Sequence, residues 1–290
     1  MKCLSLFTII LCFLTSVCFG QQGAKSGTRS TKVAVPDKSD LRVYRNLRYA
    51  ETDPMYTDTS SDRTLDLFVP VENSQNKLPV FIFIHGGGFG VGDKYGAESL
   101  WSKLLSSGFA VISINYRLHL KQNKVEAASA SANMSKGLQK FHPDLNQAIR
   151  IASEDAQLAL KWIKTNANRY QLNADLIAIS GGSAGAMAAL YTAYVSGQKI
   201  LPIKAVVDLW GGLENAELIK KGAPPVLIYH GDHDNLIHVD YAYALKRQME
   251  KIGNSRSVLR VIEGRGHAIY KLIAEEKAEE IVAFLNETLK

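Results

Sequence analysis

The sequence has almost no cysteine, and all of it lies in one place. Only three of the 290 residues are cysteines, and all three, Cys3, Cys12 and Cys18, fall within residues 1–20. If that segment is removed, the mature chain has no thiol, which excludes a disulfide framework, a cysteine nucleophile and thiolate metal sites. A chain of this length, 46% hydrophobic, can bury a full core without such cross-links.

Residues 1–20 are typical of a secretory signal. Lys2 supplies a positive start, and Leu4–Leu14 is almost continuously apolar. The apolar run is short for a membrane span, so we expect cleavage and no stable membrane insertion afterwards. Bulky Val17 before Cys18 fits lipoprotein cleavage poorly, which makes a lipid anchor at Cys18 the less favoured alternative. We therefore expect a secreted or periplasmic protein.

Other absences exclude further classes of function. The net charge is +6, but no run of basic residues is interleaved with aromatics, so we expect no nucleic acid partner. The sequence has no H-E-x-x-H motif and no EF-hand loop, and no glycine-rich stretch continues into the Gly-Lys-Ser/Thr of a phosphate-binding loop. We expect neither a metal nor a cofactor.

Strand and helix signals alternate through most of the chain, which predicts one α/β domain with a mostly parallel central sheet and helices on both faces. This domain covers residues 40–290, after a Gly-, Ser-, Thr- and Lys-rich segment, residues 21–39, that we expect to be flexible. Alternating apolar and polar positions predict half-exposed edge strands at 43–49 and 65–69. An apolar stripe predicts one closing helix over 271–289.

The most informative stretch is Leu176–Leu190, LIAISGGSAGAMAAL. An apolar strand turns into a helix within a few residues, at Gly-Gly-Ser-Ala-Gly. Gly181 and Gly185 let the strand and the helix pack closely, and Ser183 is left at the tip with its hydroxyl exposed. This is the G-x-S-x-G pattern in the structural context that indicates a nucleophilic serine.

A second glycine cluster, His85-Gly86-Gly87-Gly88-Phe89, follows the apolar strand 79–84. Consecutive glycines cost backbone entropy, so they indicate a place where bare backbone N–H groups must approach a ligand. A developing oxyanion is such a ligand. A tight turn without a ligand is the alternative.

A serine hydroxyl needs a base to take its proton, and histidine suits that role. His267 is the only histidine in a Gly-flanked loop directly after a late strand. His85 is better placed to organise its loop by hydrogen bonding, and His230, at the end of a strand, to serve as buried scaffolding.

A carboxylate must orient the histidine, and three are well placed to do so. Asp234 lies furthest into the loop after strand 225–230 and is favoured. Asp232 is expected to cap the turn, and Asp208, at the end of the preceding strand, ranks third.

Together these pieces resemble the α/β-hydrolase superfamily, and in particular serine esterases with an HGGG motif, such as the hormone-sensitive-lipase and the carbohydrate-esterase or feruloyl-esterase branches. The matching motifs are HGGGF (85–89), NYRL (115–118), GGSAG (181–185), HGDHD (230–234) and GRGH (264–267). The resemblance implies the catalytic residues Ser183, Asp234 and His267, in that chain order. It also implies an oxyanion hole made by the N–H groups of Gly87, Gly88 and Ala184.

The resemblance and the predicted export suggest small acyl esters as substrates, such as acetyl or feruloyl groups on plant polysaccharide. A serine exopeptidase of the prolyl-peptidase type and a non-catalytic binding protein are the alternatives. Residues 121–141 form either a lid or a surface loop, and are too polar and too few for the apolar cap of a long-chain lipase. Asp155 either pairs with Arg117, bracing its helix, or is an exposed helix carboxylate.

Overall fold

The computed structural model describes residues 41–71, 76–95, 98–121 and 134–290. The predicted signal, the flexible segment and residues 122–133 of the predicted lid or loop lie outside the described residues.

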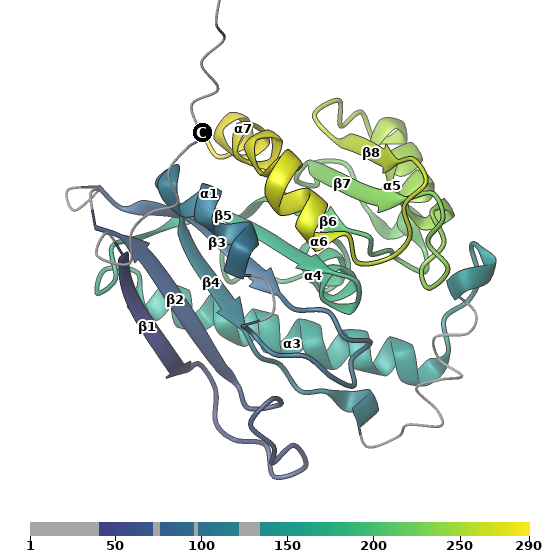
Figure 1. Ribbon diagram of the computed structural model, residues 1–290. Helices are drawn as coiled ribbons and strands as arrows, with labels where there is room; N and C mark the ends of the chain where they lie inside the picture. Colours follow the sequence, from purple (N-terminus) through teal and green to yellow (C-terminus); the bar gives the residue numbers. More distant parts are fainter. Residues whose placement is uncertain (1–40, 72–75, 96–97, 122–133) are drawn as a thin grey trace, which may run out of the picture. The chain divides into compact units, whose positions relative to one another are not determined.

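The described residues form one eight-stranded sheet in the order β1-β2-β4-β3-β5-β6-β7-β8. Two antiparallel strands at one edge are followed by six parallel strands (Figure 1). The bounds of the strands are β1 Leu41–Arg48, β2 Thr64–Pro70, β3 Leu78–Ile84, β4 Ala110–Ile114, β5 Leu172–Gly182, β6 Ile203–Leu209, β7 Val226–Gly231 and β8 Val258–Ile262. The α/β class and the mostly parallel sheet are as predicted.

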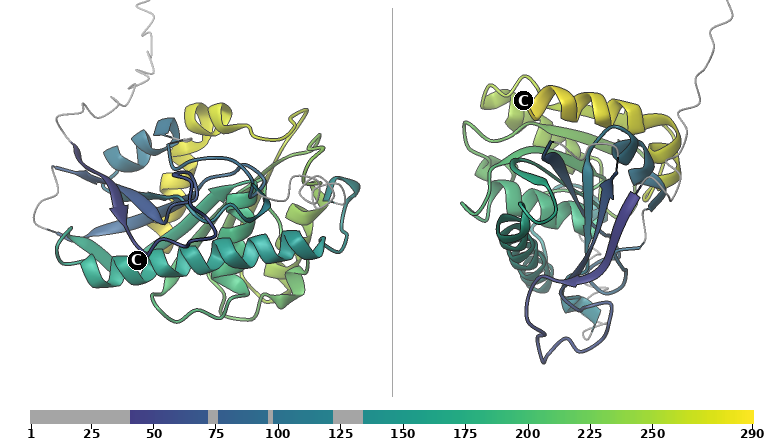
Figure 2. Two further views of the ribbon diagram at one scale, coloured as in Figure 1. Left: turned by 90° about the horizontal axis from the view of Figure 1, so that it is seen from below. Right: turned by 90° about the vertical axis from the view of Figure 1, so that its left-hand side faces the viewer.

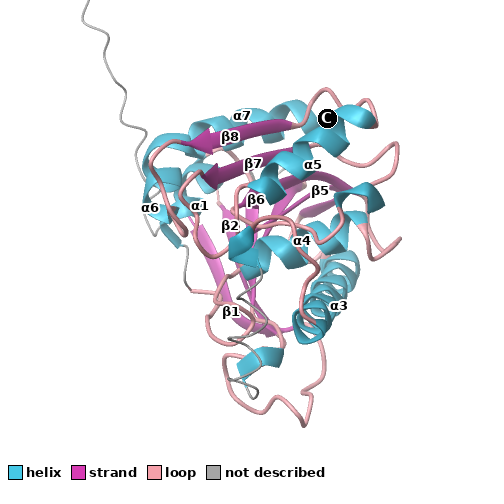
Figure 3. Cartoon of the chain, turned by 90° about the vertical axis from the view of Figure 1, so that its right-hand side faces the viewer, coloured by secondary structure: helices cyan, strands magenta, loops and turns pink. Residues whose placement is uncertain are grey.

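Helices cover both faces of this sheet because the parallel strands are apolar on both sides. The α-helices are α1 Glu98–Ser106, α3 Pro143–Asn166, α4 Ala184–Tyr194, α5 Asp240–Lys251, α6 Tyr270–Leu272 and α7 Ala278–Thr288. Residues of α3, α4 and α5 share one buried apolar cluster, and residues of α1 and α7 share the other. Figures 1 and 2 show α3 on the opposite side of the sheet from α1 and α7, and Figure 3 shows α5 and α7 on opposite sides of β7 and β8.

Two sequence predictions about these elements are wrong in detail. Strand β2 is not at the edge, because β1 pairs with one side of it and β4 with the other, and all of its residues are buried. Its alternating polar residue Asp66 meets β1 instead of water, accepting hydrogen bonds from Arg45 Nη1 at 2.6 Å and from Asn46 N at 2.8 Å.

The predicted closing helix is interrupted by a π-helical turn at Ile273–Lys277. Ile273, in this turn, and Ile281, in α7, are buried in the same apolar cluster, so the apolar stripe continues across the interruption. None of the helices in the described ranges is long and apolar enough to cross a membrane.

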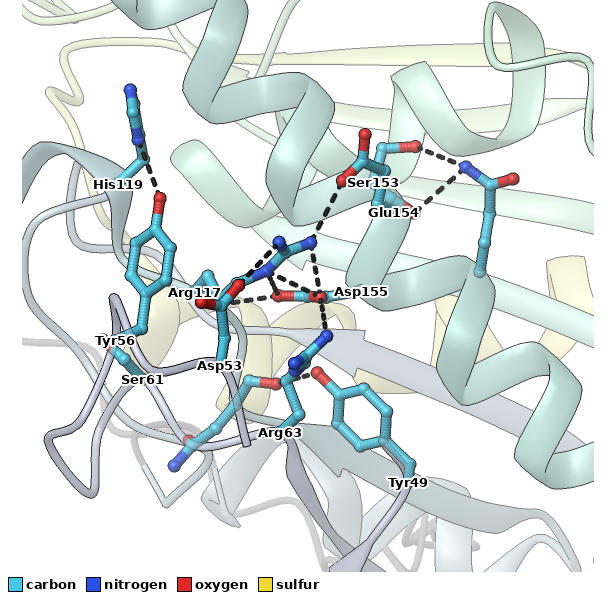
Figure 4. A network of polar contacts seen from close by, with 12 residues as sticks. Tyr49, Asp53, Tyr56, Ser61, Arg63, Arg117, His119, Ser153, Glu154 and Asp155 are labelled. Carbon is cyan, nitrogen blue, oxygen red and sulfur yellow. Dashed lines mark hydrogen bonds and ion pairs between the residues drawn. The ribbon is translucent and has the colours of Figure 1, made fainter. Parts of the chain in front are cut away.

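The predicted pair of Arg117 and Asp155 is present and braces α3 against the segment after β4 (Figure 4). Arg117 Nε lies 3.0 Å from both carboxylate oxygens of Asp155, and the Arg117 backbone N–H donates to the same carboxylate at 2.8 Å. The Asp155 side chain is 0% exposed, whereas Glu154, which also contacts Arg117, is 61% exposed. Asp155 is therefore a buried anchor and not a surface carboxylate.

We expect Asp155→Asn to lower the free energy of unfolding by about 3 kcal/mol, since it leaves a largely buried guanidinium without its main counter-charge. Glu154→Gln is the matched control, because it removes an exposed partner of the same arginine, which is worth less than about 1 kcal/mol. Urea unfolding at neutral pH measures both. Equal effects of the two substitutions would contradict the anchoring role.

Candidate active site

The residues singled out in the sequence follow four different strands and meet at one edge of the sheet. Ile84, the last residue of β3, is in register with Gly181 of β5, and Gly231 of β7 with Ile262 of β8. Because these strands are parallel, the loops that follow them all leave the sheet on its carboxyl side. This brings the glycine loop 85–89, Ser183, Asp234 and His267 together.

The turn between β5 and α4 holds Ser183 in an unusual backbone conformation, with φ at +56°. A Cβ on Gly181 would lie 2.3 Å from the carbonyl carbon of Gly185, and a Cβ on Gly185 would lie 2.0 Å from the carbonyl oxygen of Ile84. Both glycines are thus required by close packing, as predicted from the sequence. The Ser183 backbone N–H is tied to the carbonyl oxygen of Leu209, at 2.9 Å. The turn is therefore rigid, and it presents the hydroxyl above the sheet.

Ser183, His267 and Asp234 form a continuous hydrogen-bonded chain. Ser183 Oγ lies 2.8 Å from His267 Nε2, and His267 Nδ1 lies 2.7 Å from Asp234 Oδ2. An ionised carboxylate can only accept, so Nδ1 carries the imidazole hydrogen of the neutral ring. Nε2 is then an acceptor, and the serine hydroxyl donates to it. This arrangement can remove the serine proton as Oγ attacks an electrophile.

The glycine loop lines the same cavity as this chain. Gly87, Gly88 and Ala184 line it together with Ser183 and His267, and theirs are the N–H groups that the family resemblance implies for the oxyanion hole. Gly87 has φ at +108°, and a Cβ on it would lie 2.0 Å from the Val91 carbonyl oxygen. Only glycine fits there, so the loop can present its backbone at this point.

His85 organises the loop in the way we expected. Its Nδ1–H donates to the carbonyl oxygen of Gly86 at 2.7 Å, and its ring stacks on Tyr116 with the centroids 4.5 Å apart. Burial lowers the pKa of His85 to about 4, so the ring is neutral at physiological pH. His85 is a structural part of the loop and not a base.

Comparison with known proteins agrees with this geometry. Residues 65–134 and 145–213 match the family described as BD-FAE, and residues 209–290 match the prolyl oligopeptidase family. A truncated form of a carbohydrate esterase from gut microbiota superposes with a TM-score of 0.64 at 19% identity, covering 88% of this chain and 99% of the other. The chain belongs to the α/β-hydrolase superfamily. The fold and the family expected from the motifs are confirmed.

Curated relatives of this α/β hydrolase include two proteins of Mycobacterium tuberculosis. Esterase LipC is 25% identical over 274 residues, and the probable carboxylic ester hydrolase LipM is 24% identical over 290 residues. Each match covers 84% of this chain, but only 66% of LipC and 61% of LipM. The chain thus spans slightly less than two thirds of the length of these relatives.

Asp234, the carboxylate that orients His267, is surrounded by hydrogen-bond donors. Asp234 Oδ1 accepts from the backbone N–H groups of Leu236 and Ile237 at 2.9 and 3.0 Å, and His230 Nε2 lies 3.3 Å from Oδ2. Burial alone would raise the pKa of Asp234, but the nearby His230 and the hydrogen bonds from His267 and Ile237 hold it well below its usual range. The carboxylate therefore stays ionised beside the imidazole. The sequence did not indicate the contact between His230 and Asp234. It predicted only that His230 is a buried structural residue.

Asp232 and Asp208, the other two carboxylates considered from the sequence, form no hydrogen bond with His267 in the described structure. The turn-capping role expected of Asp232 belongs to Asp234, whereas Asp232 Oδ1 is buried with no hydrogen-bond partner among the described residues. Asp208 Oδ1 accepts from Gly211 N at 2.8 Å, and burial raises the pKa of Asp208 to about 6.

The cavity over Ser183 has a volume of about 470 Å³, within the range of small-molecule sites. Its walls are mostly apolar, and they include Phe83, Met134, Leu145, Met187, Trp210 and Tyr270. The sequence motifs did not indicate these wall residues, although Trp210 directly follows a strand and Tyr270 comes three residues after His267. No group of three or more His, Cys, Asp or Glu side chains in the described ranges is arranged to hold a metal.

The raised pKa of Asp208 predicts that the free energy of unfolding depends on pH. Its pKa is about 6 in the folded protein, against 3.8 for an ordinary aspartate, so the folded state binds the proton more tightly. The stabilisation is complete below pH 3.8 and is lost as the pH rises through 6.

We expect Asp208→Asn, which cannot ionise, to be more stable than the wild type at pH 8, by a margin on the order of 3 kcal/mol that disappears near pH 4. Urea unfolding across this pH range measures the margin. Asp175→Asn is the control, because the Asp175 side chain is exposed. A stability difference between Asp208→Asn and the wild type that does not change with pH would show this interpretation of Asp208 to be wrong.

Proposed function

We propose that this protein is a serine hydrolase of carboxylic esters that acts through an acyl-enzyme on Ser183. The observation that carries the proposal is the hydrogen-bonded chain from Ser183 through His267 to Asp234, at 2.8 and 2.7 Å. Ser183 and His267 line a cavity that the glycine loop also lines. The names of the relatives, esterase and carboxylic ester hydrolase, support the same reaction.

In this mechanism His267 Nε2 takes the proton of Ser183 as Oγ attacks the ester carbonyl carbon. The carbonyl oxygen becomes an oxyanion, which the N–H groups of Gly87, Gly88 and Ala184 bind. Each such donor is worth on the order of 3 kcal/mol of transition-state stabilisation. The imidazolium, stabilised by Asp234, then gives its proton to the leaving alcohol. A water molecule, activated in the same way, releases the acid and restores the serine.

The proposed substrates are esters of small acyl groups, such as acetyl or hydroxycinnamoyl groups on plant polysaccharide. The mostly apolar cavity of about 470 Å³ suits an acyl group of this size. One structural neighbour is a carbohydrate esterase by name, which supports a carbohydrate alcohol. Export through a cleaved segment at residues 1–20 completes the proposal, because such polymers lie outside the cell. N-terminal sequencing of the mature protein tests this last step.

We expect Ser183→Ala to lower kcat/KM for p-nitrophenyl acetate by about 10⁴-fold or more, since the nucleophile is lost. Ser180→Ala is the matched control. Ser180 is buried in β5, and its hydroxyl has no hydrogen-bond partner in the described structure. Its removal should leave turnover unchanged. Full activity of Ser183→Ala, or no ester turnover by the wild type, would contradict the proposed mechanism.

A substrate panel separates the proposed ester hydrolase from the alternatives. We expect turnover of p-nitrophenyl acetate and of acetylated or feruloylated oligosaccharides, and none of dipeptidyl anilides. Preferential cleavage of the anilides would favour an exopeptidase, a relationship that the match of residues 209–290 to the prolyl oligopeptidase family suggests. A wild-type protein that is not labelled by a fluorophosphonate would favour a non-catalytic binding protein.

A further inference from the structure

The peptide group that joins His85 to Gly86 has a tyrosine hydroxyl against each of its ends. The Tyr116 hydroxyl donates to the His85 carbonyl oxygen at 3.0 Å. At the other end of the same peptide group, the Tyr270 hydroxyl lies against Gly86, 3.3 Å from the point where a Cβ on this glycine would be. Because a peptide group is planar, a hydrogen bond at one end and a packed hydroxyl at the other restrict its rotation.

Tyr270 is fixed in place by its own surroundings. Its hydroxyl oxygen lies only 1.9 Å from where a Cβ on Gly182 would be, so it fills the space that this glycine leaves beside Ser183. Its ring packs edge-on against Trp210, with the centroids 4.7 Å apart. Burial raises the pKa of Tyr270 to about 12, so the hydroxyl stays neutral.

Tyr270 also connects parts of the site that are distant in sequence. The point where a Cβ on Gly86 would lie is 3.3 Å from the Tyr270 hydroxyl and 3.3 Å from Ser183 Cβ. Tyr270 follows His267 by three residues, at the start of α6. One side chain therefore links the glycine loop, the turn before α4 and the segment that carries the base.

The orientation of this peptide group matters because the loop continues directly from it. Gly87 and Gly88 follow it, so the orientation of this peptide group sets the direction in which the chain enters the two glycines whose N–H groups are assigned to the oxyanion hole. The carbonyl of Gly86 is itself held by His85 Nδ1 at 2.7 Å, so successive peptide groups are restrained. Glycines are conformationally permissive, so the loop at Gly87 and Gly88 needs restraint from its surroundings. The Gly87 carbonyl oxygen accepts from the backbone N–H groups of Gly90 and Val91 at 3.1 and 3.0 Å, and the two tyrosines restrain the peptide group before it.

We propose that Tyr116 and Tyr270 are positioning residues that orient the oxyanion donors by holding the His85–Gly86 peptide group from opposite ends. This inference rests on the proposed ester hydrolysis. Neither tyrosine is required to touch the substrate. Their effect is on how well the loop is organised for the tetrahedral intermediate.

The test compares Tyr270→Phe and Tyr116→Phe in the full chain, since phenylalanine keeps each ring and removes only the hydroxyl. We expect each substitution to lower kcat for p-nitrophenyl acetate about 10-fold, with KM changed less than about twofold, because the orientation of the glycine loop matters most in the transition state. The affinity for a phenylboronic acid, which forms a tetrahedral adduct with serine, should fall by a similar factor.

The two hydroxyls act on one peptide group, so their effects should not be independent. The double variant should lose clearly less than the roughly 100-fold product of the single losses, as expected for residues that act as a unit. Tyr229→Phe is the matched control, because the Tyr229 hydroxyl donates to Glu280 at 2.7 Å and Tyr229 does not line the cavity. It should keep wild-type kcat.

Thermal unfolding of each variant shows whether it folds, and Tyr116→Phe tests the same peptide group from the other end if Tyr270→Phe does not fold. Wild-type kcat in both single variants, or equal losses in Tyr229→Phe, would overturn the positioning role while wild-type ester turnover still supports the proposed function. An inactive wild type would instead contradict the proposed function itself.

Discussion

The close approach of α4 to β3 and β5 is the constraint on which the site depends. It is achieved because Gly181 and Gly185 have no side chains at two points where a Cβ would lie within 2.3 Å of the neighbouring backbone. The chain can then turn from strand to helix within one strained residue, Ser183, at φ +56°. The cost of that backbone conformation is offset by the packing of an almost wholly buried helix. Any longer turn would move the hydroxyl away from His267.

Two buried carboxylates near the site have pKa values that are shifted in opposite directions. Asp234 and Asp208 follow or end neighbouring parallel strands, and both are buried. Asp234 accepts hydrogen bonds from two backbone N–H groups and from His267, so it stays ionised. Asp208 accepts one, from Gly211, and burial raises its pKa to about 6. At Asp234 the hydrogen-bond donors together outweigh burial, whereas at Asp208 burial outweighs the single donor.

Much of this arrangement could be predicted because its signals are local. An apolar strand followed by glycine, serine or histidine marks a loop at the carboxyl edge, and parallel strands bring such loops together. The pairing of Arg117 with Asp155 was likewise one of two alternatives open from the sequence, and the structure shows it.

What could not be predicted depends on contacts between distant residues. The alternation of β2 resembles that of an edge strand, but Asp66 is satisfied by Arg45 of β1 and not by water. The π turn after Leu272 has no signal in the sequence, because the apolar stripe continues across it from Ile273 to Ile281. Tyr270 has no motif of its own, and its importance appears only when Gly86 and Gly182 are placed beside it.

The loop after β7 has a consequence for how this protein can change its substrate. Leu236 and Ile237 line the cavity, and their backbone N–H groups hold Asp234. A substitution there that shifts the backbone disturbs the acid as well as the wall. Met187 and Leu145 line the cavity from α4 and α3, and neither makes a hydrogen bond to the acid in the described structure. Substitutions at these two helical positions can therefore change which substrates fit the cavity without lowering the rate of the reaction.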